Sequence, residues 1–136
     1  HGFLSYLVHV AVHEKPYTIF GYKGKQVRDQ IENNDVIAAF EAFAANPRPG
    51  EVYNIGGGRE NSASVLESID LIEKLSPYRV NYTLSDQNRV GDHICYISDL
   101  RKLKSHFPDW KISMSLEDIL AAMIEMEVWK KKQATA

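Results

Sequence analysis

Short strand-like segments alternate with helical segments along most of this chain, and that alternation limits the folds open to it. Three segments read as strands: YTIF (17–20), the start of EVYNIGGG (51–58), and RVNYTL (79–84), in which apolar side chains alternate. A further short extended piece lies within RVGDHICYISD (89–99). Strands that alternate with helices predict an α/β domain with short parallel or mixed strands.

Five segments have the apolar spacing and the boundary residues of helices. They are 3–16, ended by Pro16; 33–45, capped by Asn34 or Asp35; 64–75, with the capping box Ser64-x-x-Glu67; a helix that Ser98 could cap; and a helix that opens with Ser115-x-x-Asp118. In the second of these, Ile37 and Phe40 belong to the apolar stripe. In the last, Leu116, Ile119 and Met123 are expected to be buried.

Length, charge and cysteine content narrow the class of protein. A chain of 136 residues, 44% of them hydrophobic, is long enough for one domain with its own core. A net charge of −2 gives no overall attraction to nucleic acid, so any anion binding has to be local. The single Cys95 cannot form an internal disulfide and is predicted to be buried. No apolar run long enough to span a membrane is present, and we expect one cytoplasmic domain over residues 1–136.

The glycine run in YNIGGGREN (53–61) imitates the start of a dinucleotide-binding motif. A strand leads into a glycine turn and a capped helix, and phosphate can bind at such a helix N-terminus. However, G-x-G-x-x-G requires a final glycine where this chain has Asn61, and Asp86 lies too far along the chain. The motif favours a tight turn that touches some ligand through Asn61 or Ser62 over a complete NAD site.

The segment GYKGKQVRD (21–29) places three cationic residues in a loop loosened by two glycines. Arginine suits phosphate because its planar fork donates two parallel hydrogen bonds. Taken alone, Arg28 could instead form a surface ion pair with Asp29 or Asp35, worth about 0–1 kcal/mol. The segment by itself therefore does not establish an anion site.

A second segment, RVGDH (89–93), favours an anion site over a surface ion pair of Arg28. A diphosphate needs two cationic forks, and an attached ribose offers two hydroxyl groups to one carboxylate. Arg28, Arg89 and Asp92 together would therefore form a clamp for a nucleoside diphosphate. Their spacing in the chain does not show that they meet.

Together these motifs resemble those of the NAD-dependent sugar-nucleotide epimerases and dehydratases, which are extended short-chain dehydrogenases. YKGKQVRD (22–29), EVYNIGGGRENSAS (51–64) and RVGDHICYISDLRKL (89–103) follow in the order found in the C-terminal, substrate-binding half of that family. The likeness is strongest to the branch of CDP-paratose 2-epimerases, also called CDP-tyvelose epimerases. One departure is Glu32, where the family often has a histidine.

The resemblance implies a role for each candidate residue. Arg28 and Arg89 would hold the pyrophosphate, and Asp92 would hold the ribose. Gln26 would lie beside the nucleotide, and Asn61 near the glycine turn on the substrate side. The implied ligand is a nucleoside-diphosphate sugar, CDP-linked by preference, and the implied parent reaction is NAD-dependent inversion at a sugar carbon. The implied fold is the small substrate-binding domain with an incomplete Rossmann part.

The chain lacks the family's redox parts. It has no G-x-x-G-x-x-G after an opening strand and no Tyr-x-x-x-Lys pair, so no catalytic residue is assigned to it. NAD is expected in the full-length parent and none on this chain alone. An alternative is a stand-alone non-catalytic module that binds a nucleotide sugar or pairs with a separate Rossmann chain. VYNI (52–55) would join the sheet of the absent half, so a homodimer or another partner is expected to cover it.

His9 and His13 stand one helical turn apart and could share a metal ion. The sequence shows no third ligand near them. An ordinary helix face is the favoured interpretation, and no metal site is predicted.

Overall fold

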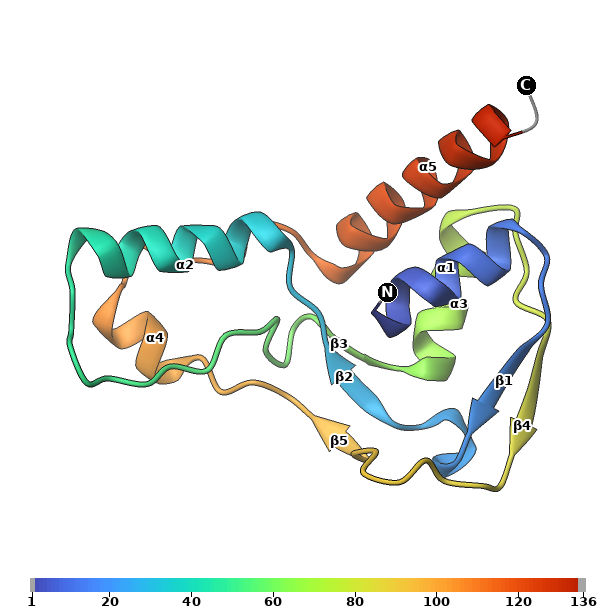
Figure 1. Ribbon diagram of the computed structural model, residues 1–136, viewed down its shortest axis with the longest axis horizontal. Coiled ribbons are helices and arrows are strands. Elements are labelled where there is room, and N and C mark those ends of the chain that lie inside the picture. Colours follow the sequence, from blue (N-terminus) through green and yellow to red (C-terminus); the bar gives the residue numbers. More distant parts are fainter. Residues whose placement is uncertain (1, 135–136) are drawn as a thin grey trace.

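The computed structural model describes residues 2–134. Figure 1 shows helices α1, α3 and α5 gathered at one end, α2 and α4 at the other, and short strands below and between them. The fold is the mixed α/β class with five helices and short strands that the sequence predicts. In chain order the elements are α1 (Phe3–Val12), β1 (Tyr17–Phe20), the 3-10 turn η1 (Tyr22–Gly24), β2 (Val27–Asp29), α2 (Asn33–Ala45), β3 (Ser62–Ser64), α3 (Val65–Leu75), β4 (Tyr82–Ser85), β5 (Cys95–Tyr96), α4 (Arg101–His106) and α5 (Leu116–Ala134).

Two apolar clusters hold the two ends together. The larger one joins α1, α3 and α5 through fully buried side chains such as Leu7, Ile72 and Leu120. Each such burial contributes about 1.5–3 kcal/mol relative to an exposed side chain. The smaller cluster packs α2 against α4 and the segment after it, with Leu103 and Trp110 buried there.

The strands form two small sheets that bring distant loops together. In one, β1 pairs with β4 in parallel, with Tyr17 opposite Tyr82. In the other, β2 lies in the middle, antiparallel to β3 and parallel to β5. Arg28 on β2 is therefore flanked by Ala63 and Tyr96 from segments far along the chain.

The start of α2 differs from the sequence expectation. Glu32 is the cap, and its carboxylate accepts a hydrogen bond of 2.6 Å from the Asn34 backbone N–H. Asp35 cannot serve as the cap because its buried carboxylate accepts from the Ser113 backbone N–H at 3.0 Å, and Trp110 Nε1 donates to its carbonyl at 2.8 Å. These bonds tie α2 to the approach of α5.

The apolar stripe of α2 is only partly buried. Ile37 is 48% exposed and Phe40 is 62% exposed, whereas Ala39 is buried against the α4 cluster. The helix therefore presents Ala39 and Phe43 to this chain's own core, and Ile37 and Phe40 to the outside.

The expected strand over residues 51–55 is absent from the described structure, because no described strand pairs with it. Val52 is 78% exposed there. Cys95 is exposed in β5, so the expectation that it is buried is wrong. An edge strand of a three-stranded sheet leaves its outer side uncovered. The homodimer or partner expected to cover residues 52–55 stays a prediction.

The last two helices bear out some of their predicted starts. Ser98 does not cap α4, since Leu100 occupies the cap position and the Asp99 carboxylate accepts from the Arg101 backbone N–H at 3.0 Å. At the start of α5, Ser115 and Asp118 exchange hydrogen bonds as expected. Among the described helices, none is both long enough and apolar enough to cross a bilayer.

A reciprocal capping box starts α3, as its sequence predicts. The Ser64 backbone N–H donates to the Glu67 carboxylate at 2.7 Å, and the Glu67 backbone N–H donates to the Ser64 hydroxyl at 3.2 Å. Two of the backbone donors that a helix start leaves open are thereby satisfied. The cap also fixes the point where β3 turns directly into α3.

Replacing Ser64 by alanine removes one half of this box. We expect Ser64→Ala to lower the free energy of unfolding by about 1 kcal/mol in urea titrations followed by circular dichroism. Ser105→Ala is the matched control, because the Ser105 hydroxyl bonds only to the Lys102 carbonyl within its own helix. Alanine favours a helix there, so equal losses in both variants would contradict the capping role.

The same box predicts a dependence on pH. Hydrogen bonds from the Ser64 backbone and hydroxyl hold the pKa of Glu67 below its ordinary value. A lowered carboxyl pKa gives stability that is present above the ordinary value and is lost as the pH falls through the lowered one. The free energy of unfolding of Glu67→Gln should therefore lie below that of the parent chain near pH 6, and this difference should shrink as the pH falls to about 3. A deficit that stays constant over that range, or Glu125→Gln behaving identically, would contradict this assignment.

Candidate nucleotide-sugar site

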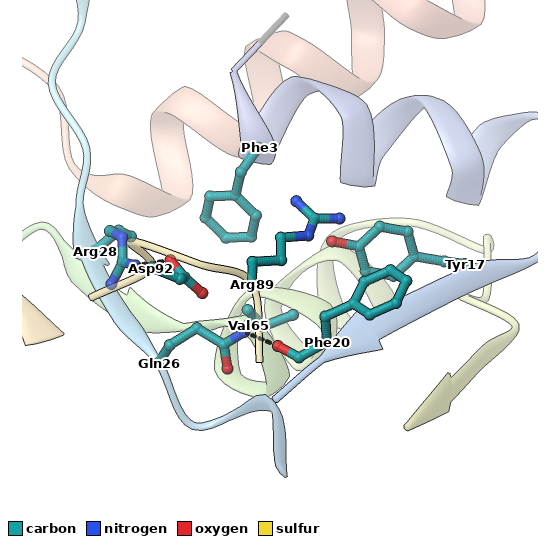
Figure 2. A pocket seen from close by; sticks show the side chains of 8 residues that line it. All are labelled: Phe3, Tyr17, Phe20, Gln26, Arg28, Val65, Arg89 and Asp92. Carbon is teal, nitrogen blue, oxygen red and sulfur yellow. Dashed lines mark hydrogen bonds and ion pairs between the residues drawn. The ribbon is translucent and has the colours of Figure 1, made fainter. Parts of the chain in front are cut away.

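One small pocket collects four of the five binding residues that the sequence singles out. Its accessible volume is about 100 Å³, and it opens between the start of α1, the loop after β1, strand β2 and the loop before β5. Figure 2 shows Arg28 and Asp92 together on one side and Arg89 extending toward Tyr17 on the other. The lining residues are Phe3, Tyr17, Phe20, Gln26, Arg28, Val65, Arg89 and Asp92.

Arg28 and Asp92 are in direct contact. The Arg28 Nη2 group donates to Asp92 Oδ1 at 2.5 Å, and Nη1 donates to the Val27 carbonyl at 2.7 Å. The two side chains are 24% and 22% exposed, so water screens this ion pair only partly. The surface pair with Asp29 or Asp35 that the sequence left open does not form.

Arg89 lies in the same pocket with a different environment. Its guanidinium carbon is 4.9 Å from the centre of the Phe20 ring, a cation–π contact. Burial raises the pKa of Tyr17, and the nearby Arg89 opposes that rise. Tyr17 therefore offers a protonated phenol at neutral pH. No carboxylate is paired with Arg89 among the described residues, so its positive charge is available to an anion.

Gln26 leaves a polar atom without a partner. Its side-chain nitrogen donates to the Phe20 carbonyl at 3.2 Å, which fixes the amide orientation because only the nitrogen can donate. Its buried Oε1 has no hydrogen-bond partner in the described structure. Leaving a buried acceptor without a partner costs about 1–3 kcal/mol.

Glycines bring the two loops of the pocket close enough to meet. Gly21 has φ +70°, and a Cβ atom there would lie 2.1 Å from Asn88 Oδ1 in the neighbouring loop. Only glycine allows both that backbone shape and that approach. The Tyr22 hydroxyl then donates to the Asp92 carbonyl at 3.3 Å. Lys23 and Lys25 are exposed and do not line the pocket.

Asn61 is not part of this group. Its side-chain nitrogen donates to the Met114 carbonyl at 2.8 Å, and its oxygen accepts from the Leu116 backbone N–H at 3.1 Å. The residue is buried, and both ends of its amide hold the start of α5. Both polar atoms of this amide are thus bonded within the chain, and the contact expected on the substrate side stays a prediction. A contact through Ser62 is not supported either, because its hydroxyl bonds to the Arg59 carbonyl at 2.8 Å.

The glycine turn serves packing. A Cβ atom on Gly57 would lie 1.8 Å from the Gln30 carbonyl oxygen, and one on Gly56 would lie 2.5 Å from Asp29 Oδ2. That same Asp29 oxygen accepts from the backbone N–H groups of Gly58 at 2.9 Å and Ser98 at 3.0 Å. The turn is followed by β3, and α3 begins only at Val65, so the three glycines do not lie at a helix N-terminus.

Sequence reasoning missed the apolar and aromatic wall of the pocket, formed by Phe3, Tyr17, Phe20 and Val65. Their residue types are those of core positions and carry no chemical signal of their own. The available hint was position, because Tyr17 and Phe20 bound the strand that leads into the basic loop.

Known proteins resemble the chain in sequence and in fold. No family model matches the chain. It is 33% identical over 113 residues to the CDP-paratose 2-epimerase of Salmonella typhi, which covers 82% of the chain and 32% of that enzyme. It is also 33% identical over 109 residues to the dTDP-glucose 4,6-dehydratase of Haemophilus influenzae, covering 79% of the chain and 29% of that enzyme.

Solved structures resemble the chain over nearly its whole length. One is the UDP-glucuronic acid 4-epimerase of Bacillus cereus, in complex with UDP-glucuronic acid and NAD. The match covers 91% of this chain and 38% of the epimerase chain, with 29% identity and a TM-score of 0.79. Another is the UDP-glucose 4-epimerase of Thermotoga maritima with UDP-glucose. That match covers 97% of this chain and 40% of the epimerase chain, with 27% identity and a TM-score of 0.80. The chain spans about a third of the length of the curated relatives it matches.

The role of Asp29 can be tested by its removal. Asp29→Ala leaves the Gly58 and Ser98 backbone donors without their acceptor, so we expect the free energy of unfolding to fall by about 2–3 kcal/mol. Asp86→Ala is the control, an exposed carboxylate for which we expect a change within about 0.5 kcal/mol. Urea titration measures both. A stable Asp29→Ala variant would mean that the glycine turn does not depend on this carboxylate.

Proposed function

The chain belongs to the family of NAD-dependent sugar-nucleotide epimerases and dehydratases, and from this premise we propose that its pocket binds the diphosphate and ribose of a nucleoside-diphosphate sugar. The observation that carries the proposal is the meeting of Arg28, Arg89 and Asp92 in one pocket, although 60 residues or more separate the first from the others. Relatives that act on nucleotide sugars and neighbours solved with UDP-sugars support the ligand class.

Each side chain has a distinct role in this proposal. Arg28 and Arg89 donate to the two phosphates, for which a planar fork is better suited than a lysine. Asp92 uses Oδ1 for Arg28, which leaves Oδ2 to accept hydrogen bonds from the ribose hydroxyl groups. The unpaired Oε1 of Gln26 takes a donor from the nucleotide.

The size of the pocket limits what this chain holds. Ligand pockets commonly measure about 300–1,000 Å³, so a cavity of about 100 Å³ surrounds only part of a nucleotide sugar. We propose that residues 1–136 form a substrate-binding domain and that the remaining length of the relatives corresponds to the part that holds NAD. The cofactor would supply hydride transfer there, in an epimerisation for which a CDP-linked sugar is favoured by the CDP-paratose 2-epimerase relative.

Binding of CDP and of inorganic pyrophosphate separates the proposed roles. Isothermal titration calorimetry of the 136-residue chain should show that Arg28→Gln or Arg89→Gln weakens CDP binding by about 10- to 150-fold, since each charge-assisted hydrogen bond contributes about 1.5–3 kcal/mol. Asp92→Asn should weaken CDP binding but leave pyrophosphate binding unchanged or tighter. Pyrophosphate carries no ribose and gains from the loss of a neighbouring negative charge.

Arg101→Gln is the matched control, because its guanidinium is 91% exposed and pairs with Asp99 far from the pocket lining. Circular dichroism of every variant checks that the fold is retained. CDP affinity that is the same in Arg28→Gln, Arg89→Gln and Arg101→Gln would overturn the proposed site. Equal weakening of CDP and pyrophosphate by Asp92→Asn would overturn the ribose contact alone.

A further inference from the structure

A second cluster of chemically active side chains lies where α1 crosses α5. His9 lies in the last turn of α1 and His13 directly follows the helix, with their ring centres 4.4 Å apart. Glu127 of α5 brings a carboxylate between them, with Oε1 2.7 Å from His9 Nδ1 and 3.1 Å from His13 Nε2. The sequence showed no third ligand because Glu127 lies 118 residues after His9.

We propose that this His9–His13–Glu127 cluster is a binding site for a divalent transition metal ion of the zinc class. Two imidazoles and a carboxylate are the donor set that such ions prefer, and three protein ligands leave a fourth position for water. The three ligand atoms lie within 4.8 Å of one another. A tetrahedral ion with bonds of about 2.1 Å needs ligand atoms about 3.4 Å apart, so small side-chain shifts complete the site.

The surroundings favour ligation by these groups. The side chains of His9, His13 and Glu127 are 32%, 25% and 14% exposed, so an ion can reach them from solvent while the helices hold them in place.

Two lysines oppose a metal ion and supply the sharpest test. Lys15 Nζ is 3.0 Å from His9 Nε2, and Lys130 Nζ is 3.5 Å from Glu127 Oε2. A lysine ammonium group only donates, so Nε2 of His9 accepts and Nδ1 carries the proton that faces Glu127. A metal ion at Nδ1 reverses this, leaving an N–H at Nε2 against the ammonium group. Lys15 is exposed and has to swing away when the ion binds.

If the cluster binds a metal ion, removing the Lys15 ammonium group should raise its metal affinity. If the cluster is held only by hydrogen bonds, removing Lys15 takes away one of these bonds and creates no metal affinity. We expect the chain to bind one equivalent of Co²⁺ or Zn²⁺, with the visible absorption bands of tetrahedral Co²⁺ for the first. His13→Gln and Glu127→Gln should weaken binding at least tenfold, while Lys15→Gln should tighten it severalfold.

His93→Gln and Glu125→Gln are the matched controls, because both side chains are exposed and lie outside the cluster. Their Co²⁺ affinity should equal that of the parent chain. Three outcomes would overturn the proposal: no saturable binding, binding that survives Glu127→Gln, or weaker binding in Lys15→Gln. None of these outcomes bears on nucleotide binding, because the two sites share no residue.

Discussion

Strand β2 is only three residues long, yet two neighbouring charges on it connect the pocket to the rest of the fold. Successive side chains of a strand point to opposite faces. Arg28 consequently reaches Asp92 in the pocket, while Asp29 reaches the backbone of Gly58 and Ser98. The same short strand thus holds the glycine turn and the loop before α4 in place, and it presents a guanidinium group to the pocket.

The two arginines of the pocket already have partners inside the chain. An anion would have to replace the contact of Arg89 with the Phe20 ring and to join Asp92 at Arg28. Arg89 rests on the Phe20 ring, a contact worth about 0.5–1 kcal/mol near the surface. A charge-assisted hydrogen bond to a phosphate oxygen is worth about 1.5–3 kcal/mol, so exchanging the ring for a phosphate is favourable. Arg28 need not leave Asp92, because its planar group can donate to a carboxylate and a phosphate at once.

Helix α1 contributes to both candidate sites. Phe3 in its first turn lines the candidate pocket, whereas His9 in its last turn and His13 just after it face Glu127 of α5. The helix can serve both because the core around it is closely packed, with Leu7, Val10 and Val12 fully buried. A rigid helix fixes the relative positions of side chains that face in different directions.

Local order was readable from the sequence alone. The strand 17–20, the capping box at Ser64 and the family motifs depend on residues close together in the chain, as periodicity and caps do. Tertiary structure decided what each polar side chain touches: Arg28 meets Asp92, Asn61 supports α5, and His9 meets Glu127. Those pairings join segments 55 to 118 residues apart, and no local rule specifies them. They arise only when buried faces pack and bring distant segments into contact.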